Sequence, residues 1–390
     1  MRWRTTLPAP GNSTPVVWGD RVFVTQPQQN RRAILCFNRR DGKRLWQAAA
    51  TATETETVYA ENPACSSSPV VDGKRVIAWF GSAGIYCYDF NGKELWHRDL
   101  GPQSHQWGYA SSPVLYRNLC LLNFGPGDRS FIIALDKNSG RTVWKSDVPP
   151  VSNSTRYEDL GGDPKWAERP NAQKLSEIAG SWATPLVVSA GGRDELVVAL
   201  PLQLVALAPR TGEPLWHCKG PNLGAYSSAF FGEGIVGLTG SGFRNTALAV
   251  RPGGQGDVTG TRRLWFSQLP NSKGCISSGI IFRGHVYLVT MAGFAVCLDL
   301  QTGNSVWEER LTGTGSRNGS YCSPLLAGDR LYIANQNADV FVLRAGPKFD
   351  CLATNSIGGE SMNASLALSD GDLFLRTAQG LWCIQDRGGR

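Results

Sequence analysis

A short sequence recurs along this 390-residue chain, and it constrains the fold more than any other feature. The clearest copies are ALDKNSGRTVW at 134–144, ALAPRTGEPLW at 206–216 and CLDLQTGNSVW at 297–307. Looser copies are CFNRRDGKRLW at 36–46 and CYDFNGKELW at 87–96. Each has a small residue near its start, a Gly towards its middle and a closing Trp. Repetition of this kind indicates that one supersecondary unit is copied along the chain.

The closing Trp recurs every 40 to 50 residues, except for a gap of 72 residues between Trp144 and Trp216. In the seventh copy Leu352 stands where the Trp is expected, a variation that we expect the fold to tolerate. The other closing residues are Trp46, Trp96, Trp265 and Trp307. Each copy also opens on a similar short segment. The eight openings are NSTPVV at 12–17, SSSPVV at 66–71, ASSPVL at 110–115, WATPLV at 182–187, YSSAFF at 226–231, ISSGII at 276–281, YCSPLL at 321–326 and MNASLA at 362–367.

Four strands can be recognised within one copy. In the second copy they are SSSPVV at 66–71, RVIAWF at 75–80, IYCYDF at 85–90 and LWHRDL at 95–100. Asp-Gly, Gly and Asn-Gly turns separate these apolar, β-branched or aromatic segments, which indicates an antiparallel meander. We name its strands A to D from the axis outwards, because four-stranded repeats of this length form propeller blades.

The two ends of the sequence predict how the ring closes. The eighth copy contains strands A, B and C, but nothing after them resembles a strand D. The segment RWRTTL at 2–7 matches the D strand LWHRDL at 95–100. We therefore expect the N-terminal strand to complete the last blade, which removes two exposed sheet edges. The prediction is an all-β, eight-bladed propeller of four-stranded antiparallel blades, forming one domain over residues 1–390.

The cysteines and histidines indicate neither disulfides nor zinc. Cys36, Cys87, Cys297 and Cys383 occupy the same place in four copies, on a strand expected to be buried. Equivalent positions in different blades lie too far apart to pair, so these residues are expected to be small core hydrophobes. The sequence has no CxxC pair, and its four histidines are isolated, which argues against a zinc site.

Charge and hydropathy exclude several classes of partner. The net charge is +7, and the 39 basic residues are scattered without forming a patch for nucleic acid or a membrane surface. No apolar run is long enough to span a membrane, and the N-terminus has no apolar signal region. If no leader has been removed, the sequence predicts a cytoplasmic protein. We also expect a monomer.

The repeat resembles the tryptophan-docking repeat of pyrroloquinoline quinone (PQQ) propellers, Ala-x-Asp-x-x-Thr-Gly-x-x-x-Trp. The resemblance covers essentially the whole chain and extends to BamB-like propellers and to secreted PQQ-like repeat proteins of planctomycetes. It implies the fold and an exported protein, periplasmic or extracellular, if a leader has been removed. The residues that carry it are Ala134, Asp136, Gly140, Trp144, Ala206, Thr211, Gly212, Trp216, Asp299, Thr302, Gly303 and Trp307.

Relatives of this kind include quinoprotein dehydrogenases and cofactor-free scaffolds. The resemblance to the dehydrogenases implies PQQ held between a Trp and a disulfide of adjacent cysteines, a Ca²⁺ ion bound by Glu, Asn and Asp, and an Asp base. This sequence has no adjacent cysteines and lacks the extra length of those enzymes. It also has no GxSxG, HExxH or Walker motif, and we assign no catalytic residue. We expect no cofactor, with a PQQ- and Ca²⁺-dependent or metal-dependent oxidoreductase as an alternative.

Two acidic segments are candidates for a calcium or lanthanide site without PQQ. ETETVYAEN at 54–62 and YEDLGGD at 157–163 lie in links from one blade's strand D to the next blade's strand A. Such links open around the axial funnel of a propeller, and hard cations prefer several carboxylate or carbonyl oxygens. The alternative is a pair of solvated acidic loops. The candidate metal ligands are Glu54, Glu56, Glu158 and Asp159.

The same D-to-A links carry aromatic and polar residues that predict a binding site in the funnel. A concave funnel with aromatic side chains and a few convergent polar groups suits a sugar, a quinone or a peptide side chain. We expect His105 to be a hydrogen-bonded loop residue and not a catalytic base. The candidate ligand-binding residues are Glu61, His105, Trp107, Tyr109, Trp182, Tyr226, Arg317, Tyr321 and Asn363.

The long gap between copies three and four contains an insert at residues 146–181. Loops of this length are usually functional or disordered. We expect a lid over the funnel, with Tyr157 and Trp166 as its packing residues, and surface decoration is the alternative. The sequence thus predicts a non-catalytic binding or scaffold propeller for a small molecule, a glycan or a protein. The second alternative is a BamB-like interaction module in outer-membrane protein assembly.

Overall fold

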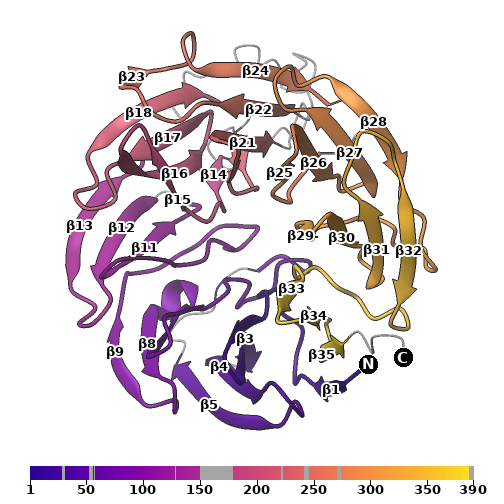
Figure 1. Cartoon of the computed structure of the whole chain (residues 1–390). Coiled ribbons are helices and arrows are strands. Elements are labelled where there is room, and N and C mark those ends of the chain that lie inside the picture. Colours follow the sequence, from indigo (N-terminus) through magenta and orange to yellow (C-terminus); the bar gives the residue numbers. More distant parts are fainter. Residues whose placement is uncertain are drawn as a thin grey trace, which may run out of the picture.

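The computed structural model describes residues 1–28, 31–51, 56, 58–127, 129–149, 179–220, 223–240, 246–269 and 274–385. Eight antiparallel sheets are arranged around a central axis as an eight-bladed propeller (Figure 1). Across these ranges there is no α-helix, and Gly81–Ala83 forms a single 3-10 turn. The described part of the chain contains no helix with the length and apolar character that a membrane span requires.

In blades 1 to 7 the strands follow the chain from the axis outwards, in the order A to D. Blade 1 contains β2 (Val16–Trp18), β3 (Arg21–Gln28), β4 (Arg31–Asn38) and β5 (Arg44–Thr51), and blade 2 contains β6 (Val70–Val71), β7 (Arg75–Trp79), β8 (Ile85–Asp89) and β9 (Glu94–Arg98). Blade 3 contains β10 (Val114–Tyr116), β11 (Leu119–Phe124), β12 (Phe131–Asp136) and β13 (Thr142–Asp147). Blade 4 contains β15 (Leu186–Ala190), β16 (Arg193–Leu200), β17 (Gln203–Leu207) and β18 (Pro214–Lys219). Blade 5 contains β20 (Phe230–Gly232), β21 (Ile235–Gly240), β22 (Thr246–Val250) and β24 (Arg263–Gln268). Blade 6 contains β25 (Ile280–Phe282), β26 (His285–Val289), β27 (Phe294–Asp299) and β28 (Ser305–Arg310). Blade 7 contains β29 (Leu325–Ala327), β30 (Arg330–Ala334), β31 (Asp339–Arg344) and β32 (Cys351–Ser356).

Blade 8 joins the two ends of the sequence. It contains β33 (Ala367–Ser369), β34 (Asp372–Arg376) and β35 (Gly380–Gln385), and its outer strand is β1 (Trp3–Thr6). β1 pairs antiparallel with β35, with Trp3 opposite Cys383. The first and last strands of the described chain, β1 and β35, accordingly lie side by side in this blade (Figure 1). The predicted architecture, blade number and closing strand are confirmed.

The recurrent Trp docks most blades onto the next. Trp96, on strand D of blade 2, donates from Nε1 to the Lys137 carbonyl at 3.0 Å. Its ring covers Gly140 in the turn of blade 3, where an added Cβ would lie 2.6 Å from the ring and where φ is +70°. The repeat therefore needs a Gly in each turn and a Trp in the preceding blade. Equivalent hydrogen bonds join Trp3, Trp46, Trp144, Trp265 and Trp307 to the carbonyls of Arg39, Phe90, Pro209, Leu300 and Gly346.

The Ser or Thr of each opening links neighbouring blades near the axis. Thr14 N donates to Ser68 Oγ at 2.8 Å, and Ser68 N donates to Ser112 Oγ at 2.9 Å. The chain of hydrogen bonds continues to Ser365, which accepts from Ser323 N at 3.0 Å. The eighth opening is therefore offset by one residue from our alignment, and Asn363 takes its first position. The intervening acceptors are Thr184, Ser228, Ser278 and Ser323.

Two short parallel pairings add to the regular blades. The Gly-rich connection at 252–260 contributes β23 (Gly256–Asp257), which pairs with the outer strand β18 of blade 4. β23 thus covers a sheet edge that would otherwise be open. β14 (Gly180–Ser181) pairs with β19 (Gly224–Ala225), which ties together the entries to blades 4 and 5.

Most of the predicted insert at residues 146–181 falls outside the described residues. The first two residues of the predicted insert, Ser146 and Asp147, belong to strand β13. Residues 150–178, which include the proposed lid residues Tyr157 and Trp166, lie outside the described residues, so the lid stays a prediction.

All ten cysteines are unpaired, and all except Cys351 are buried. The prediction that the repeated cysteines are core hydrophobes is confirmed.

Candidate ligand-binding site in the axial funnel

A cavity of about 570 Å³ lies on the propeller axis, on the face of the D-to-A links. One residue from each blade lines it, and in every case this is the first residue of the opening. Because the third residue of each opening is hydrogen-bonded to a neighbouring blade, the first residues are held in a ring around the axis. These eight residues are Asn12, Ser66, Ala110, Trp182, Tyr226, Ile276, Tyr321 and Asn363.

Aromatic residues form one side of the cavity. The ring centroids of Trp107 and Trp182 lie 5.8 Å apart, and those of Trp182 and Tyr226 lie 4.8 Å apart. Trp182 is fixed further by its Nε1, which donates to the Gly108 carbonyl at 2.9 Å. The His105 ring packs edge-on against Trp182, with 4.9 Å between the ring centroids. We call Trp107, Trp182 and Tyr226 the aromatic wall; such surfaces stack well on flat or cationic groups.

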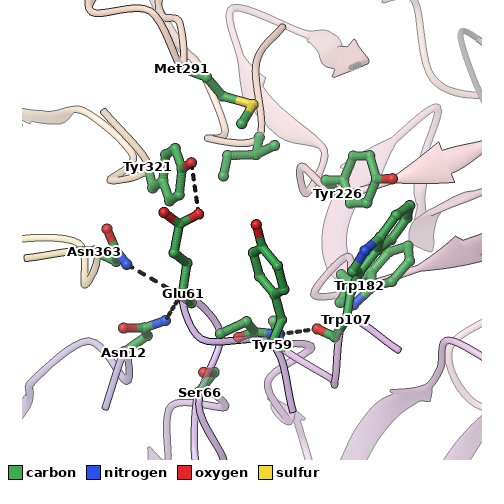
Figure 2. A pocket seen from close by; sticks show the side chains of 13 residues that line it. Asn12, Tyr59, Glu61, Ser66, Trp107, Trp182, Tyr226, Met291, Tyr321 and Asn363 are labelled. Atoms are coloured by element: carbon green, nitrogen blue, oxygen red, sulfur yellow. Dashed lines mark hydrogen bonds between the residues drawn. The ribbon is translucent and has the colours of Figure 1, made fainter. Parts of the chain in front are cut away.

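Glu61 lies on the opposite side of the cavity (Figure 2). Tyr321 donates its hydroxyl to Glu61 Oε2 at 3.1 Å. Burial raises the pKa of Tyr321 to about 12, and the neighbouring Glu61 carboxylate raises it too. The phenol therefore keeps its proton at neutral pH and remains a donor to the carboxylate.

The segment at residues 58–62, which we call the cross-funnel loop, supplies both Glu61 and Tyr59. Asn12 Nδ2 and Asn363 Nδ2 donate to the Glu61 carbonyl at 2.8 Å and 3.2 Å. On the other side, Asn62 Nδ2 donates to the Trp107 carbonyl at 2.6 Å. These hydrogen bonds fasten the loop, which leaves blade 1, to the entries of blades 1, 3 and 8. Tyr59 lies between Glu61 and the aromatic wall (Figure 2).

The structure brings together most of the predicted site residues. Those that line the cavity are Glu61, Trp107, Trp182, Tyr226, Tyr321 and Asn363. Tyr109 is fully buried, and burial raises its pKa well above the ordinary value. The centroid of its ring lies 4.8 Å from that of Trp79. His105 is also buried, and its Nδ1 accepts from Trp107 N at 3.2 Å, as expected for a loop residue. Arg317 is exposed and lies outside the lining of the cavity.

Sequence reasoning missed seven lining residues. Asn12, Ser66, Ala110 and Ile276 hold the first position of an opening, so a consistent reading of that position would have found them. Tyr59, Asn62 and Met291 come from connecting segments with no repeated pattern, and no sequence signal marks them.

The structure gives Glu56 a partner within the protein. Its carboxylate accepts from Arg32 at 3.1 Å and from Ser82 N at 2.5 Å, and both ionic side chains are buried. Glu54, Glu158 and Asp159 lie outside the described residues, so the two-loop cation site stays a prediction. Within the described ranges, no three His, Cys, Asp or Glu side chains are grouped so that they could hold a metal ion.

The profile of the family described as outer membrane protein assembly factor BamB matches residues 1–124, 59–222 and 128–390 in overlapping segments. The chain belongs to this family. A curated BamB of Alkalilimnicola ehrlichii is 28% identical over 138 residues, which is 35% of this chain and 33% of that protein. The chain therefore matches only about a third of the length of this relative.

Two solved structures share the fold across nearly the whole chain. BamB from Moraxella catarrhalis has a TM-score of 0.64 at 14% identity, covering 99% of this chain and 97% of its own. The quinohemoprotein alcohol dehydrogenase ADHIIG from Pseudomonas putida HK5 also has a TM-score of 0.64, at 11% identity, covering 100% of this chain and 76% of its own. At these identities the likeness shows the fold alone, because one fold carries different chemistries.

The cavity of this BamB-family member does not fit PQQ. That cofactor is a polyanion with several carboxylates, whereas the described lining has a carboxylate and no Lys, Arg or His. Burying like charges together is strongly unfavourable. No adjacent cysteines are present either. We accordingly derive no redox step for this site.

Proposed function

We propose that this protein is a non-catalytic binding propeller whose axial funnel holds a ligand. The supporting observation is the cavity itself, to which all eight blades contribute a side chain and which has an aromatic wall facing Glu61. Its volume of about 570 Å³ is in the usual range for small-molecule sites. Family membership supports a periplasmic or extracellular location, reached by a form that carries a leader.

A second candidate function, a BamB-like protein-interaction module, is favoured by the outer edge of blade 7. Every residue of β32 (Cys351–Ser356) is exposed. An open edge strand of this kind can pair with an extended segment of another protein. The same propeller could use the funnel for a ligand and the rim for a partner.

Ligand-dependent thermal unfolding tests the proposed function. A library of small cations, anions, sugars and peptides is screened against wild type, Tyr226→Ala and Phe266→Ala. Phe266 is an exposed aromatic on the outer strand β24 and serves as the matched control. A ligand at 100 times its dissociation constant stabilises the native state by about 2.7 kcal/mol. We expect compounds that stabilise wild type and Phe266→Ala but not Tyr226→Ala.

Two outcomes contradict this proposal. One is the absence of any stabilising compound, and the other is equal stabilisation of wild type and the Tyr226→Ala variant. Samples containing PQQ with Ca²⁺, and Ca²⁺ alone, belong in the same series. A shift that requires both additives would support the oxidoreductase alternative, and a shift with Ca²⁺ alone would point to the acidic segments.

A further inference from the structure

The charge of the funnel is opposite to that of the whole protein. Although the net charge of the chain is +7, Glu61 is the only ionised side chain among the residues described as lining the cavity. In the described part of the chain, Glu61 makes no ion pair, and its carboxylate accepts one hydrogen bond, from the Tyr321 hydroxyl to Oε2. The residues described as lining the cavity include no basic side chain that could neutralise it.

Several hydrogen-bond donors of the lining are directed into the protein. Asn12 and Asn363 donate to the Glu61 carbonyl, and Asn62 donates to the carbonyls of Trp107 and Tyr109. The Ser66 hydroxyl and the Trp182 indole also donate to main-chain carbonyls, those of Pro63 and Gly108. Within the described ranges, the hydroxyls of Tyr59 and Tyr226 and the indole of Trp107 make no such hydrogen bond and stay available to an occupant. The cavity thus offers an occupant aromatic surface, one carboxylate and a few donors.

The aromatic wall supplies the second component of a cation site. Trp107, Trp182 and Tyr226 lie on one side of the cavity, and Glu61 lies on the other (Figure 2). The faces of indole and phenol rings attract cations, and the attraction strengthens when water is excluded. Met291 and Ile276 complete the lining with apolar surface suited to alkyl substituents.

We infer that the funnel recognises an organic cation, an alkyl-substituted ammonium or a guanidinium, held between the Glu61 carboxylate and the aromatic wall. This inference rests on the proposed binding function and specifies its ligand class. The cation can belong to a free small molecule or to a Lys or Arg side chain of a peptide. Anions are disfavoured by Glu61, and a neutral sugar gains no charge attraction from it.

Calorimetric titration tests the charge requirement with a matched pair of probes. Choline carries the quaternary ammonium, and 3,3-dimethylbutan-1-ol is its neutral carbon analogue of the same shape. We expect choline to bind about tenfold more tightly than the neutral analogue, and to weaken as salt is added. Acetyl-trimethyllysine amide and acetyl-arginine amide test the peptide source; preference for either source supports the inference.

Glu61→Gln is the informative variant, because it keeps the shape and the acceptor for Tyr321 but removes the charge. We expect it to lose the roughly tenfold preference for choline while it still binds the neutral analogue. Glu309→Gln, on the outer strand β28, makes the same charge change away from the funnel and should leave the preference unaltered. Circular dichroism of each variant shows that it is folded.

The outcomes separate this inference from the proposed function. Equal binding of choline and its neutral analogue, or a preference that survives in Glu61→Gln, overturns the cation inference. Tight binding of glucose in place of any cation also overturns it, but leaves the funnel as a binding site. Failure of every probe, together with a negative library screen, overturns both.

Discussion

At the scale of single residues, buried polar side chains set the positions of the links that lead to the funnel. Asp339 is completely buried and accepts hydrogen bonds from Thr314 N at 2.9 Å, Thr314 Oγ1 at 2.7 Å and Asn335 Nδ2 at 3.0 Å. It thereby fixes the link that ends at Tyr321. Burial alone would raise the pKa of Asp339, but these hydrogen bonds outweigh burial and lower it.

Substitution of Asp339 by Asn should therefore have a pH-dependent effect. A lowered pKa in the folded state means that the ionised carboxylate stabilises the fold at pH values above the unfolded pKa, about 3.9. That contribution is lost as the pH falls from there through the folded pKa. We expect Asp339→Asn to lower the free energy of unfolding by about 2 kcal/mol at pH 7, and by less below pH 4.

Urea unfolding at pH 7 and at pH 3 measures this difference. Asp20→Asn is the control, since the Asp20 side chain is 70% exposed and its replacement should matter by less than about 0.5 kcal/mol. An equal loss of stability for Asp339→Asn at both pH values would show that shape, and not charge, is what Asp339 contributes.

At the scale of elements, the docking of Trp explains why one blade lacks it. In most blades the Trp docks against the turn between strands C and D of the following blade; Trp216 of blade 4 donates instead to Glu195 of its own blade. In blade 8 those strands are β35 and β1, which come from opposite ends of the sequence, so no turn joins them. The strand register of blade 7 places Ala353 opposite Val342, as Trp307 is opposite Cys297 in blade 6, so Ala353 and not Leu352 stands where the Trp is expected. A Trp at position 353 would have no turn to cover, and its absence follows from how the ring closes.

Two substitutions test this explanation in opposite directions. Trp307→Leu loses the hydrogen bond to the Gly346 carbonyl at 3.0 Å and part of the packing with Phe349, and we expect a loss of about 2 kcal/mol. Ala353→Trp, at the exposed position equivalent to Trp307, should change the free energy of unfolding by less than about 0.5 kcal/mol. Denaturant unfolding measures both. A gain from Ala353→Trp similar to the loss from Trp307→Leu would mean that docking does not need the turn.

At the scale of the whole molecule, stability depends on the seam between blades 8 and 1. Arg376, on strand β34, is fully buried and donates to the Thr25 carbonyl at 2.6 Å, to Gln26 Oε1 at 3.0 Å and to the Ser13 hydroxyl. Burial lowers the pKa of Arg376 to about 10, so the side chain is still charged at neutral pH. Further out, Arg39 pairs with the buried Asp372 of blade 8 at 3.0 Å.

Arg376→Ala should loosen this seam specifically. The variant leaves buried acceptors on blade 1 without a donor and opens a cavity, so we expect a loss of about 3 kcal/mol. Arg330→Ala, at an exposed position on strand β30, is the matched control and should cost less than about 0.5 kcal/mol. Hydrogen exchange should quicken first in β1 and β33–β35. Uniform loosening of all eight blades would show that the seam is no weaker than other junctions.

The sequence determined the repeated unit, the number of blades and the strand that closes the ring, because these follow from local patterns. Strand length, the Gly turn and the docking Trp act between neighbours, and most copies carry all three. The aromatic wall was also predicted, since Trp182 and Tyr226 occupy openings and Trp107 precedes one.

Only the tertiary structure decided which residues meet at the axis and what charge they create there. Glu61 contacts Tyr321, 260 positions away, and its carbonyl accepts from Asn363, because ring closure brings those blades together. Glu56, five residues before Glu61, turns instead towards Arg32, and no sequence pattern distinguishes the two carboxylates. Arg317 was expected in the funnel and lies outside it for the same reason: the path of a link depends on side chains from other blades.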